Sequence, residues 1–289
     1  MLDLNQFMWI EKYRPKTIDE CILSDDNKKY FKSLLDKNEI PNLLLSGDAG
    51  CGKTTVAKAL CDQLGADWLF INGSEESGID TLRNTIKNFA VTKSFNGGTK
   101  VVIIDEADYL SPAFQNGFKA FMEGYASNCR FILTCNNKNK LIKPLHSRLT
   151  NIEFKLDPKD KPLIAKQFFK RVLFILKQED IEANNEVIAA IIQKYFPDFR
   201  KTIVELQKNV YNNTISDKIL ASSDAEVDEL VSILKSKDWQ KMREWVAQNV
   251  VDYDVNDLFR IIYDKLVPIT DQGPHLVVMI ASYQHKSAF

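Results

Sequence analysis

The sequence predicts an α/β domain with a parallel sheet, followed by two helical regions. Up to about residue 157, short apolar segments alternate with helical stretches, which is the pattern of βαβ units. After Asp157-Pro158 we find only helical periodicity, and a polar break at Ser222-Ser223 divides it. We therefore expect domains at residues 1–157, 158–222 and 223–289.

The strands of the first domain are predicted from near-continuous apolar runs. Such runs are typical of strands that are buried on both faces of a parallel sheet. Two helix starts are also marked, by a capping box at residues 77–80 and by Ser111-Pro112, an N-cap with proline at the first helical position. The predicted strands are residues 42–46, 68–72, 100–105, 131–135 and 152–154.

Apolar residues at helical spacing predict the remaining helices. Ile164, Phe168, Val172 and Ile175 form the first such series. Comparable series occur at residues 188–195, 203–210, 227–234, 239–246 and 255–266. No strand is predicted after residue 157.

Composition excludes several classes of protein. The 289 residues carry 38 Lys and Arg against 39 Asp and Glu, a net charge of -1, which does not fit a protein that coats nucleic acid electrostatically. No apolar run approaches the roughly 18 residues of a membrane span, and the polar N-terminus is not a secretory signal. Five cysteines without a C-x-x-C pair and three scattered histidines predict neither a disulfide framework nor a zinc site, so we expect a cytosolic protein.

Residues 47–54, GDAGCGKT, match the phosphate-binding pattern G-x-x-x-x-G-K-[ST]. The pattern follows a predicted strand and precedes an apolar periodic stretch that begins at Val56, which is the context that it requires. Backbone N–H groups of such a loop and the following helix N-terminus bind phosphate oxygens. We expect Lys53 to reach the β- and γ-phosphates and the Thr54 hydroxyl to bind Mg²⁺. The alternative is a glycine-rich turn before a helix.

A second motif ends the predicted strand at residues 100–105. Asp105 is expected to hold Mg²⁺, and Glu106 to orient and deprotonate the attacking water. The alternative interpretation of this motif is a buried strand that ends in a solvated acidic turn. Together the two motifs predict ATP- or GTP-dependent phosphoryl transfer. The letters DEAD at residues 105–108 also occur in RNA helicases, but those enzymes need a second α/β domain, which is not predicted here.

The order of these motifs resembles the AAA+ sliding-clamp-loader ATPase subunits, above all the large subunit of tailed-phage clamp loaders, and next the replication factor C small subunits. The resemblance rests on WIEKYRP at residues 9–15, the phosphate loop, DEAD, TCNN at 134–137, SRL at 147–149 and FPDFRK at 196–201. It covers residues 9 to about 210. Beyond that point only the helical pattern is similar. The resemblance implies an AAA+ domain, a helical lid and a helical collar for oligomerisation.

The resemblance also implies roles for individual residues. Asn136 would be sensor 1, Arg148 the arginine finger that enters a neighbouring subunit's site, and Arg200 sensor 2 on the lid. Alternatively, Asn136 caps a strand end and either arginine forms an ordinary surface ion pair. The nucleotide would lie against Glu11, Tyr13, Arg14, Pro15, Gly47, Ala49, Gly50, Cys51, Gly52, Lys53, Thr54, Thr55 and Arg200.

A DNA-binding helix and a coupling route are implied as well. Gly78, Ile79, Arg83 and Lys87 would face the template strand, although a solvated basic face is the alternative. Ile86 and Phe89 are candidates for clamp anchors or for core packing. Gln115 and Lys119 would couple DNA contact to the ATP site.

Three features depart from the family pattern. Leu149 replaces a cysteine, Lys119-Ala120 replaces two arginines, and the given sequence stops one or two helices before relatives usually end, which leaves both a naturally short collar and an incomplete sequence open. The first is expected to alter packing only, whereas the second leaves the coupling route open.

We therefore expect a Mg²⁺-dependent ATPase subunit of a clamp loader, stimulated by clamp and DNA. ATP binding would open the clamp, and hydrolysis would release it on primer-template DNA. The expected partners are further copies of the chain, a second subunit type, the clamp and DNA, in the cytoplasm of a phage-infected bacterium. The alternatives are another oligomeric AAA+ DNA motor of the branch-migration type, a non-hydrolysing ATP-binding scaffold and a small-molecule kinase.

Overall fold

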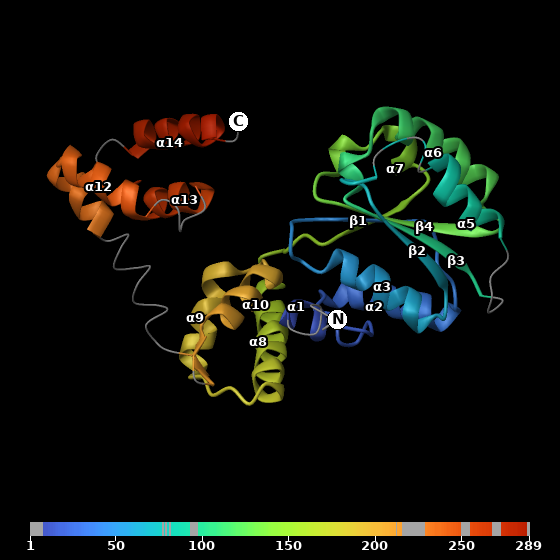
Figure 1. Ribbon diagram of the computed structural model, residues 1–289, viewed down its shortest axis with the longest axis horizontal. Coiled ribbons are helices and arrows are strands. Elements are labelled where there is room, and N and C mark those ends of the chain that lie inside the picture. The colour runs from blue at the N-terminus through green and yellow to red at the C-terminus, as the bar shows by residue number, and fades with distance from the viewer. Residues whose placement is uncertain are drawn as a thin grey trace, which may run out of the picture. The chain divides into compact units, whose positions relative to one another are not determined.

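The computed structural model describes residues 8–76, 78, 80, 82–92, 98–211, 213–215, 229–249, 255–267 and 273–287. The chain forms two compact units, residues 1–215 and 216–289. The first unit contains the predicted α/β domain together with the helices that follow it (Figure 1). The division into three domains stays a prediction.

The first unit is built on a five-stranded parallel sheet, as the sequence predicted. Its strands, β1 to β5 along the chain, lie in the order β2-β3-β4-β1-β5. This order places the carboxyl ends of β3, β4 and β1 side by side, and ligands of open α/β sheets bind at that edge. The strands are β1 (Leu43–Ser46), β2 (Asp67–Asn72), β3 (Lys100–Asp105), β4 (Cys129–Cys135) and β5 (Thr150–Glu153).

Helices cover both faces of the sheet (Figure 1). Alternate strand residues point to opposite faces, so Val102 and Ile104 join one core cluster while Val101 and Ile103 join the other. The first cluster is closed by α5 (Lys87–Val91), α6 (Pro112–Gly124) and α7 (Lys143–His146), and the second by α2 (Asp25–Lys37) and α3 (Lys53–Gln63). The uninterrupted apolar strands follow from this burial on both sides.

The predicted helix start at Ser111-Pro112 is confirmed. Ser111 caps α6 by accepting a hydrogen bond from the Phe114 N–H at 3.2 Å, and Pro112 occupies the first turn. The capping box at residues 77–80 lies partly outside the described residues. Beyond it, Leu82–Ile86 form a π-helical stretch, labelled η2, that leads into α5. Ile86 is fully buried and Phe89 packs against the same cluster, which favours the core-packing alternative for both.

In the described part of the first unit, the sheet is followed by the helices α8 (Lys161–Gln178), α9 (Asn185–Tyr195) and α10 (Phe199–Lys208). The expectation that only helices follow residue 157 is wrong, because β6 (Val210–Tyr211) pairs antiparallel with β7 (Thr214–Ile215). Two-residue strands are too short to show a period in the sequence. The N-terminal helix α1 (Trp9–Lys12) packs against α10, where the Trp9 N–H donates to Gln207 Oε1 at 3.0 Å.

The second unit is helical throughout its described part. Residues 229–236, α12 (Trp239–Asn249) and α13 (Val255–Leu266) match predicted series. Helix α14 (Gly273–Ser287) was not predicted, because its apolar residues 276–280 are consecutive and so show no helical period. Among the residues that the structure describes, no helix combines the length and apolarity needed to cross a membrane.

Candidate nucleotide-binding site

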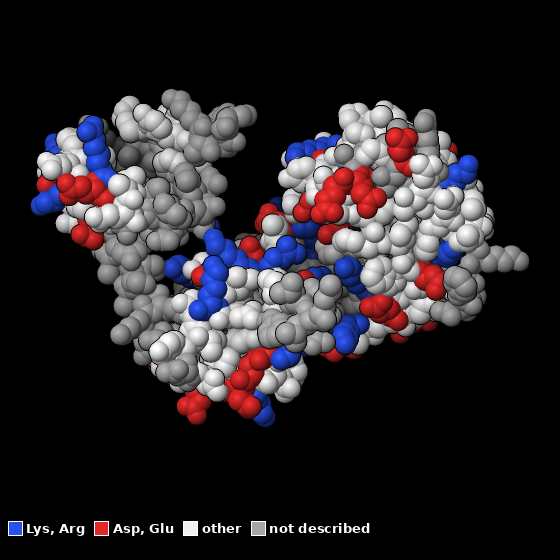
Figure 2. All heavy atoms as spheres, in the orientation of Figure 1, with Lys and Arg blue, Asp and Glu red and all other residues white. Residues whose placement is uncertain are grey.

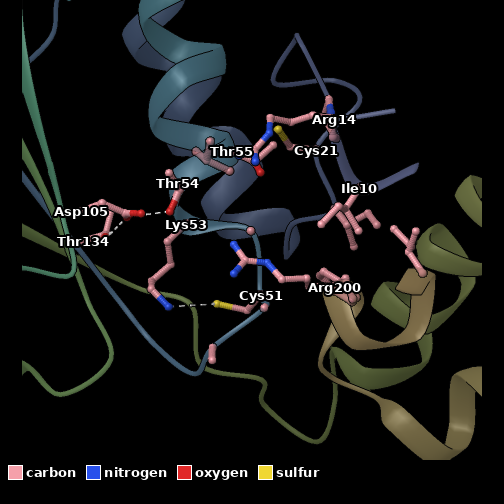
Figure 3. A pocket seen from close by; sticks show the side chains of 18 of the residues that line it. Ile10, Arg14, Cys21, Cys51, Lys53, Thr54, Thr55, Asp105, Thr134 and Arg200 are labelled. Carbon is pink, nitrogen blue, oxygen red and sulfur yellow. Dashed lines mark hydrogen bonds between the residues drawn. The ribbon is translucent and has the colours of Figure 1, made fainter. Parts of the chain in front are cut away.

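A cavity opens where the carboxyl edge of the sheet meets the N-terminal segment and the helices α8 and α10 (Figure 3). It brings together residues that are up to about 190 positions apart in the chain. Ile10, Cys21 and Ile22 add apolar surface, and Phe168, Phe199 and Ile203 do so from the helical side. Of the predicted nucleotide-binding residues, the cavity wall contains Glu11, Tyr13, Arg14, Pro15, Ala49, Gly50, Cys51, Gly52, Lys53, Thr54, Thr55 and Arg200.

Gly47 is the predicted nucleotide contact that does not line the cavity. Its N–H donates to the Cys135 carbonyl at 3.2 Å, and a Cβ there would lie 2.9 Å from the Cβ of Phe154. Gly47 therefore lets the loop leave β1 between two neighbouring segments, which a larger residue would push apart.

The phosphate loop needs glycine at two further positions. Gly50 and Gly52 adopt the left-handed region with φ of 73° and 92°. Gly52 is the N-cap residue of α3, so its conformation aims the N-terminus of this helix at the cavity. At Gly50 there is a second constraint, because a Cβ would lie 1.9 Å from Oδ1 of Asp198, which caps α10. The loop and the lid helix meet at Gly50.

We expect Gly50→Ala to weaken ATP binding by at least about 10-fold, because strain of this kind costs on the order of 1–3 kcal/mol and the loop or the Asp198 side chain must also move. Titration with a non-hydrolysable ATP analogue measures this loss of affinity. Gly65→Ala is the matched control, since Gly65 also has a positive φ of 59° but nothing lies within 4 Å of its Cβ position. Equal losses in the two variants would show that contact with Asp198 is irrelevant.

Lys53 is 7% exposed, and its ammonium group is surrounded by acceptors. Nζ donates to the carbonyls of Gly47 at 2.8 Å and Asp48 at 2.7 Å, and to Oδ1 of Asn136 at 2.9 Å. The side chain of Asn136 thus contacts the phosphate-loop lysine directly and does not cap the end of β4. The lysine and the predicted sensor 1 can act on the same phosphate group.

Thr54 and Asp105, the predicted magnesium ligands, are in direct contact. Thr54 Oγ1 donates to Asp105 Oδ1 at 2.6 Å, and Thr134 Oγ1 donates to the same oxygen (Figure 3). A hydroxyl and a carboxylate oxygen fit Mg²⁺, which prefers oxygen ligands and commonly takes one or two from the protein. Thr134 was not predicted, although it begins the TCNN motif.

Glu106 is held in an unusual backbone conformation with φ of 53°. Its N–H donates to Thr134 Oγ1 at 3.2 Å. Behind it, the Gly73 N–H donates to the Asp105 carbonyl at 2.7 Å, and a Cβ on Gly73 would lie 2.7 Å from the Glu106 carbonyl oxygen. Strained backbone of this kind is concentrated at functional sites. In this conformation Glu106 lies in the cavity wall beside Asp105.

Asp108 supports the loop that carries Asn136. It is 8% exposed, and its two carboxylate oxygens accept hydrogen bonds from the N–H groups of Asn136 at 3.4 Å and Asn137 at 3.3 Å. The last residue of the DEAD motif therefore orients the predicted sensor 1. Sequence reasoning did not assign it this role.

The N-terminal segment is anchored to α8 by polar contacts. The Tyr13 phenol donates to Glu179 at 2.6 Å, and burial together with this hydrogen bond raises the pKa of Tyr13. Arg171 Nη2 donates to the Tyr13 carbonyl at 2.8 Å, while Arg171 Nε is buried without a hydrogen-bond partner. Within the segment, Arg14 pairs with Glu11. Arg171 also lines the cavity but was not predicted, because it lies in an ordinary amphipathic helix.

Arg200 extends from the first turn of α10 toward the phosphate loop (Figure 3). The same helix carries Lys201 and Lys208, and Figure 2 shows basic side chains gathered over it. Within the cavity itself, Lys53 and Arg200 contribute positive charge, which favours a polyanionic ligand. The cavity therefore combines apolar side chains, cationic side chains and two oxygen groups that fit Mg²⁺, the Thr54 hydroxyl and the Asp105 carboxylate.

Comparison with known proteins agrees with this arrangement. Residues 43–156 match the family of ATPases associated with various cellular activities (AAA), and residues 160–221 match the AAA+ ATPase lid domain of sliding-clamp-loader large subunits. The sliding-clamp-loader large subunit of Enterobacteria phage T4 is 42% identical over 89% of this chain and 83% of its own length. The chain belongs to this clamp-loader family. The replication factor C small subunit of Archaeoglobus fulgidus is 33% identical over 91% of this chain and 86% of its own.

The fold is shared more widely. The RuvB Holliday junction branch migration motor of Thermotoga maritima superposes with a TM-score of 0.54 at 20% identity, covering 78% of this chain and 80% of that one. At this identity the likeness shows the AAA+ fold alone, and so it does not favour the branch-migration alternative.

Other residues implicated by the family pattern lie outside the cavity. Arg148 forms an ion pair with Glu123 in its own chain. Leu149, at the position of the family cysteine, is buried in the core behind it. Gln115 is 3% exposed and joins two loops, since it donates to the Leu110 carbonyl at 3.0 Å and accepts from the Ile142 N–H at 2.9 Å. These loops follow Glu106 and Asn136 in the chain, and the coupling role of Gln115 stays a prediction.

The predicted DNA contacts lie between residues 78 and 87. Gly78 and Lys87 are exposed. Arg83 belongs to the π-helical stretch, but its side chain lies outside what the structure describes, and so does Ile79. Lys119 on α6 is half-buried. The DNA-binding role of these residues stays a prediction.

Proposed function

We propose that the chain is an ATP-hydrolysing subunit of a sliding-clamp loader. The observation that carries this function is the contact of Thr54 with Asp105 in a cavity where Lys53 also meets Asn136. Membership of the clamp-loader family supports the same conclusion. A small-molecule kinase would need neither the lid arginine Arg200 nor the helical second unit.

Each part of the cavity has a chemical task in this proposal. Thr54 and Asp105 would hold Mg²⁺, which would neutralise developing charge on the phosphates. Lys53 and the backbone N–H groups of the loop bind the β- and γ-phosphates. Glu106 accepts a proton from the attacking water, and Asn136 orients that water against the γ-phosphate. Arg200 closes the lid over the same phosphate.

The base and ribose occupy the side of the cavity between the N-terminal segment and α8. Ile10, Ile22 and Phe168 supply apolar surface there. Tyr13 to Pro15 are tied to α8 through Arg171, so binding in this part of the cavity and lid position are mechanically linked. Nucleotide binding thereby sets the orientation of the lid.

Several copies form a partial ring together with a second subunit type, and Arg148 of one copy completes the site of the next. ATP binding holds the sliding clamp open, and primer-template DNA then aligns Glu106, Asn136 and the trans Arg148 for hydrolysis. Gly78, Ile79, Arg83 and Lys87 contact the phosphate backbone, which suits loading at any sequence. The ring works in the cytoplasm of a phage-infected bacterium.

The test is the ATPase rate of the chain co-expressed with its partner subunits, with and without clamp and primer-template DNA. We expect clamp and DNA together to raise the Mg²⁺-dependent rate by at least about 10-fold, because hydrolysis waits for alignment. Strand displacement or branch migration driven by ATP, without stimulation by clamp, would favour a DNA motor of another kind.

A further inference from the structure

Arg148 is held by two helices of its own chain. Its Nε donates to Glu123 Oε1 at 2.9 Å, and its Nη2 donates to the same oxygen. Its Nη1 donates to the Pro144 carbonyl at 2.8 Å and to Ser147 Oγ at 3.3 Å. Glu123 is in the last turn of α6 and Pro144 in α7, so the guanidinium lies between them.

These hydrogen bonds use four of the five N–H donors of the Arg148 guanidinium. A guanidinium has one N–H on Nε and two on each Nη. Glu123 takes the Nε donor and one Nη2 donor, while Pro144 and Ser147 take those of Nη1. One Nη2–H has no partner among these contacts. The guanidinium is therefore fixed on several sides and still has a donor available for an anion.

Both partners of this ion pair are charged around neutral pH. The hydrogen bond from Arg148 and, to a smaller extent, the positive charge of Lys119 lower the pKa of Glu123, so its carboxylate stays ionised. Glu123 is 59% exposed and Arg148 28%. The acidic partner is thus the more exposed of the two, and the arginine is the more buried.

We propose that Glu123 is a positioning residue for the trans-acting Arg148, an inference that rests on the proposed function of that arginine. Glu123 selects one rotamer of a long, flexible side chain and keeps it before a neighbouring subunit approaches. A group that is already ordered does not lose rotamer freedom when the sites meet, and misplacement of a catalytic group by about 1 Å can cost 10²-fold in rate.

Helix α6 makes this arrangement rigid. Gln115, Lys119 and Glu123 follow one another in steps of four along the helix, and Gln115 ties its first half to the loops after Glu106 and Asn136. The helix that carries Glu123 is therefore fixed at its other end to the loops that follow Glu106 and Asn136.

The experiment uses the loader assembled with its partner subunits, clamp and primer-template DNA. Glu123→Ala is expected to lower the stimulated kcat by about 10-fold, as loss of supporting contacts around a functional group commonly does. The KM for ATP and the assembly of the ring should not change. Glu123→Gln keeps an acceptor oxygen for the charged guanidinium and should stay within about 3-fold of the unmodified protein, since a hydrogen bond with one ionised partner is still charge-assisted.

Two further variants separate the possible explanations. Asp19→Ala removes a comparable exposed ion pair, that of Asp19 with Lys32 at 2.7 Å, and should leave kcat unchanged. Glu123→Ala combined with Arg148→Ala should be no slower than Arg148→Ala alone, because residues that act through one another are not additive. If Glu123→Ala does not fold, Glu123→Asp, which is shorter by one methylene, replaces it with the same expectation.

The outcomes distinguish this inference from the proposed function. If Arg148→Ala abolishes stimulation but Glu123→Ala does not slow it, the positioning role is wrong and the trans arginine stands. A faster rate in Glu123→Ala would show that the glutamate restrains the arginine, which also overturns the inference. If Arg148→Ala itself has no effect, the proposed function of Arg148 fails first and the positioning role with it.

Discussion

Glu106→Gln is expected to reduce ATP hydrolysis by about 10²–10⁴-fold while ATP binding remains, because an amide cannot take the proton of the attacking water. The contact between Thr54 and Asp105 does not involve the Glu106 side chain, and the strained backbone at Glu106 depends on the bonds of its main chain. Single-turnover hydrolysis measures the loss, and titration with a fluorescent ATP analogue measures binding.

Glu39→Gln is the matched control for this variant. Glu39 is an exposed carboxylate that precedes β1 and so lies toward the opposite edge of the sheet. The Glu39→Gln variant should hydrolyse ATP at the rate of the unmodified protein. Undiminished hydrolysis in Glu106→Gln would show that another group activates the water. Absence of hydrolysis in the unmodified protein, even with its partners, clamp and DNA, would favour the non-hydrolysing scaffold.

Arg148→Ala is expected to leave ATP binding intact and to lower the clamp- and DNA-stimulated ATPase by about 10³–10⁵-fold, the contribution known for an arginine supplied in trans. Arg148 does not line the cavity of its own chain, and its contacts there are with Glu123, Pro144 and Ser147. Binding by the isolated chain therefore should not depend on it. Steady-state ATPase assays of the assembled loader test this.

Mixed rings show whether the arginine acts on its own site or on a neighbour's. A chain with Arg148→Ala and a chain with Glu106→Gln are each expected to be inactive in uniform rings. When they are mixed, an Arg148→Ala chain keeps Glu106 and receives Arg148 from a Glu106→Gln neighbour, so part of the activity should return. Mixed rings that stay as inactive as both parents would contradict action in trans.

Much of the site is encoded locally. The phosphate loop and Asn136 each follow a strand, and Asp105 ends one; an apolar run marks each of these strands in the sequence, and parallel strands bring their carboxyl ends to one edge. Local spacing predicted the residues at that edge. The contact of Lys53 with Asn136 needed one further fact, namely that β4 lies between β3 and β1.

Other contacts had no local signal. Asp198 against Gly50 and Arg171 against Tyr13 join segments about 150 residues apart, and neither Asp198 nor Arg171 differs in pattern from an ordinary capping or helical residue. The β6–β7 hairpin was missed because two residues cannot show an alternation. In α14 a consecutive apolar run hides the period.

The amino-acid sequence by itself determined the class of fold, the order of its main elements and the residues that are expected to bind phosphate and magnesium, because apolar periodicity and glycine placement are properties of neighbouring residues. Only the tertiary structure decided which side chains support them: Asp108 under Asn136, Thr134 beside Asp105 and Glu123 behind Arg148. These pairs depend on how helices and strands pack after they form, and packing brings together residues whose spacing along the chain follows no rule.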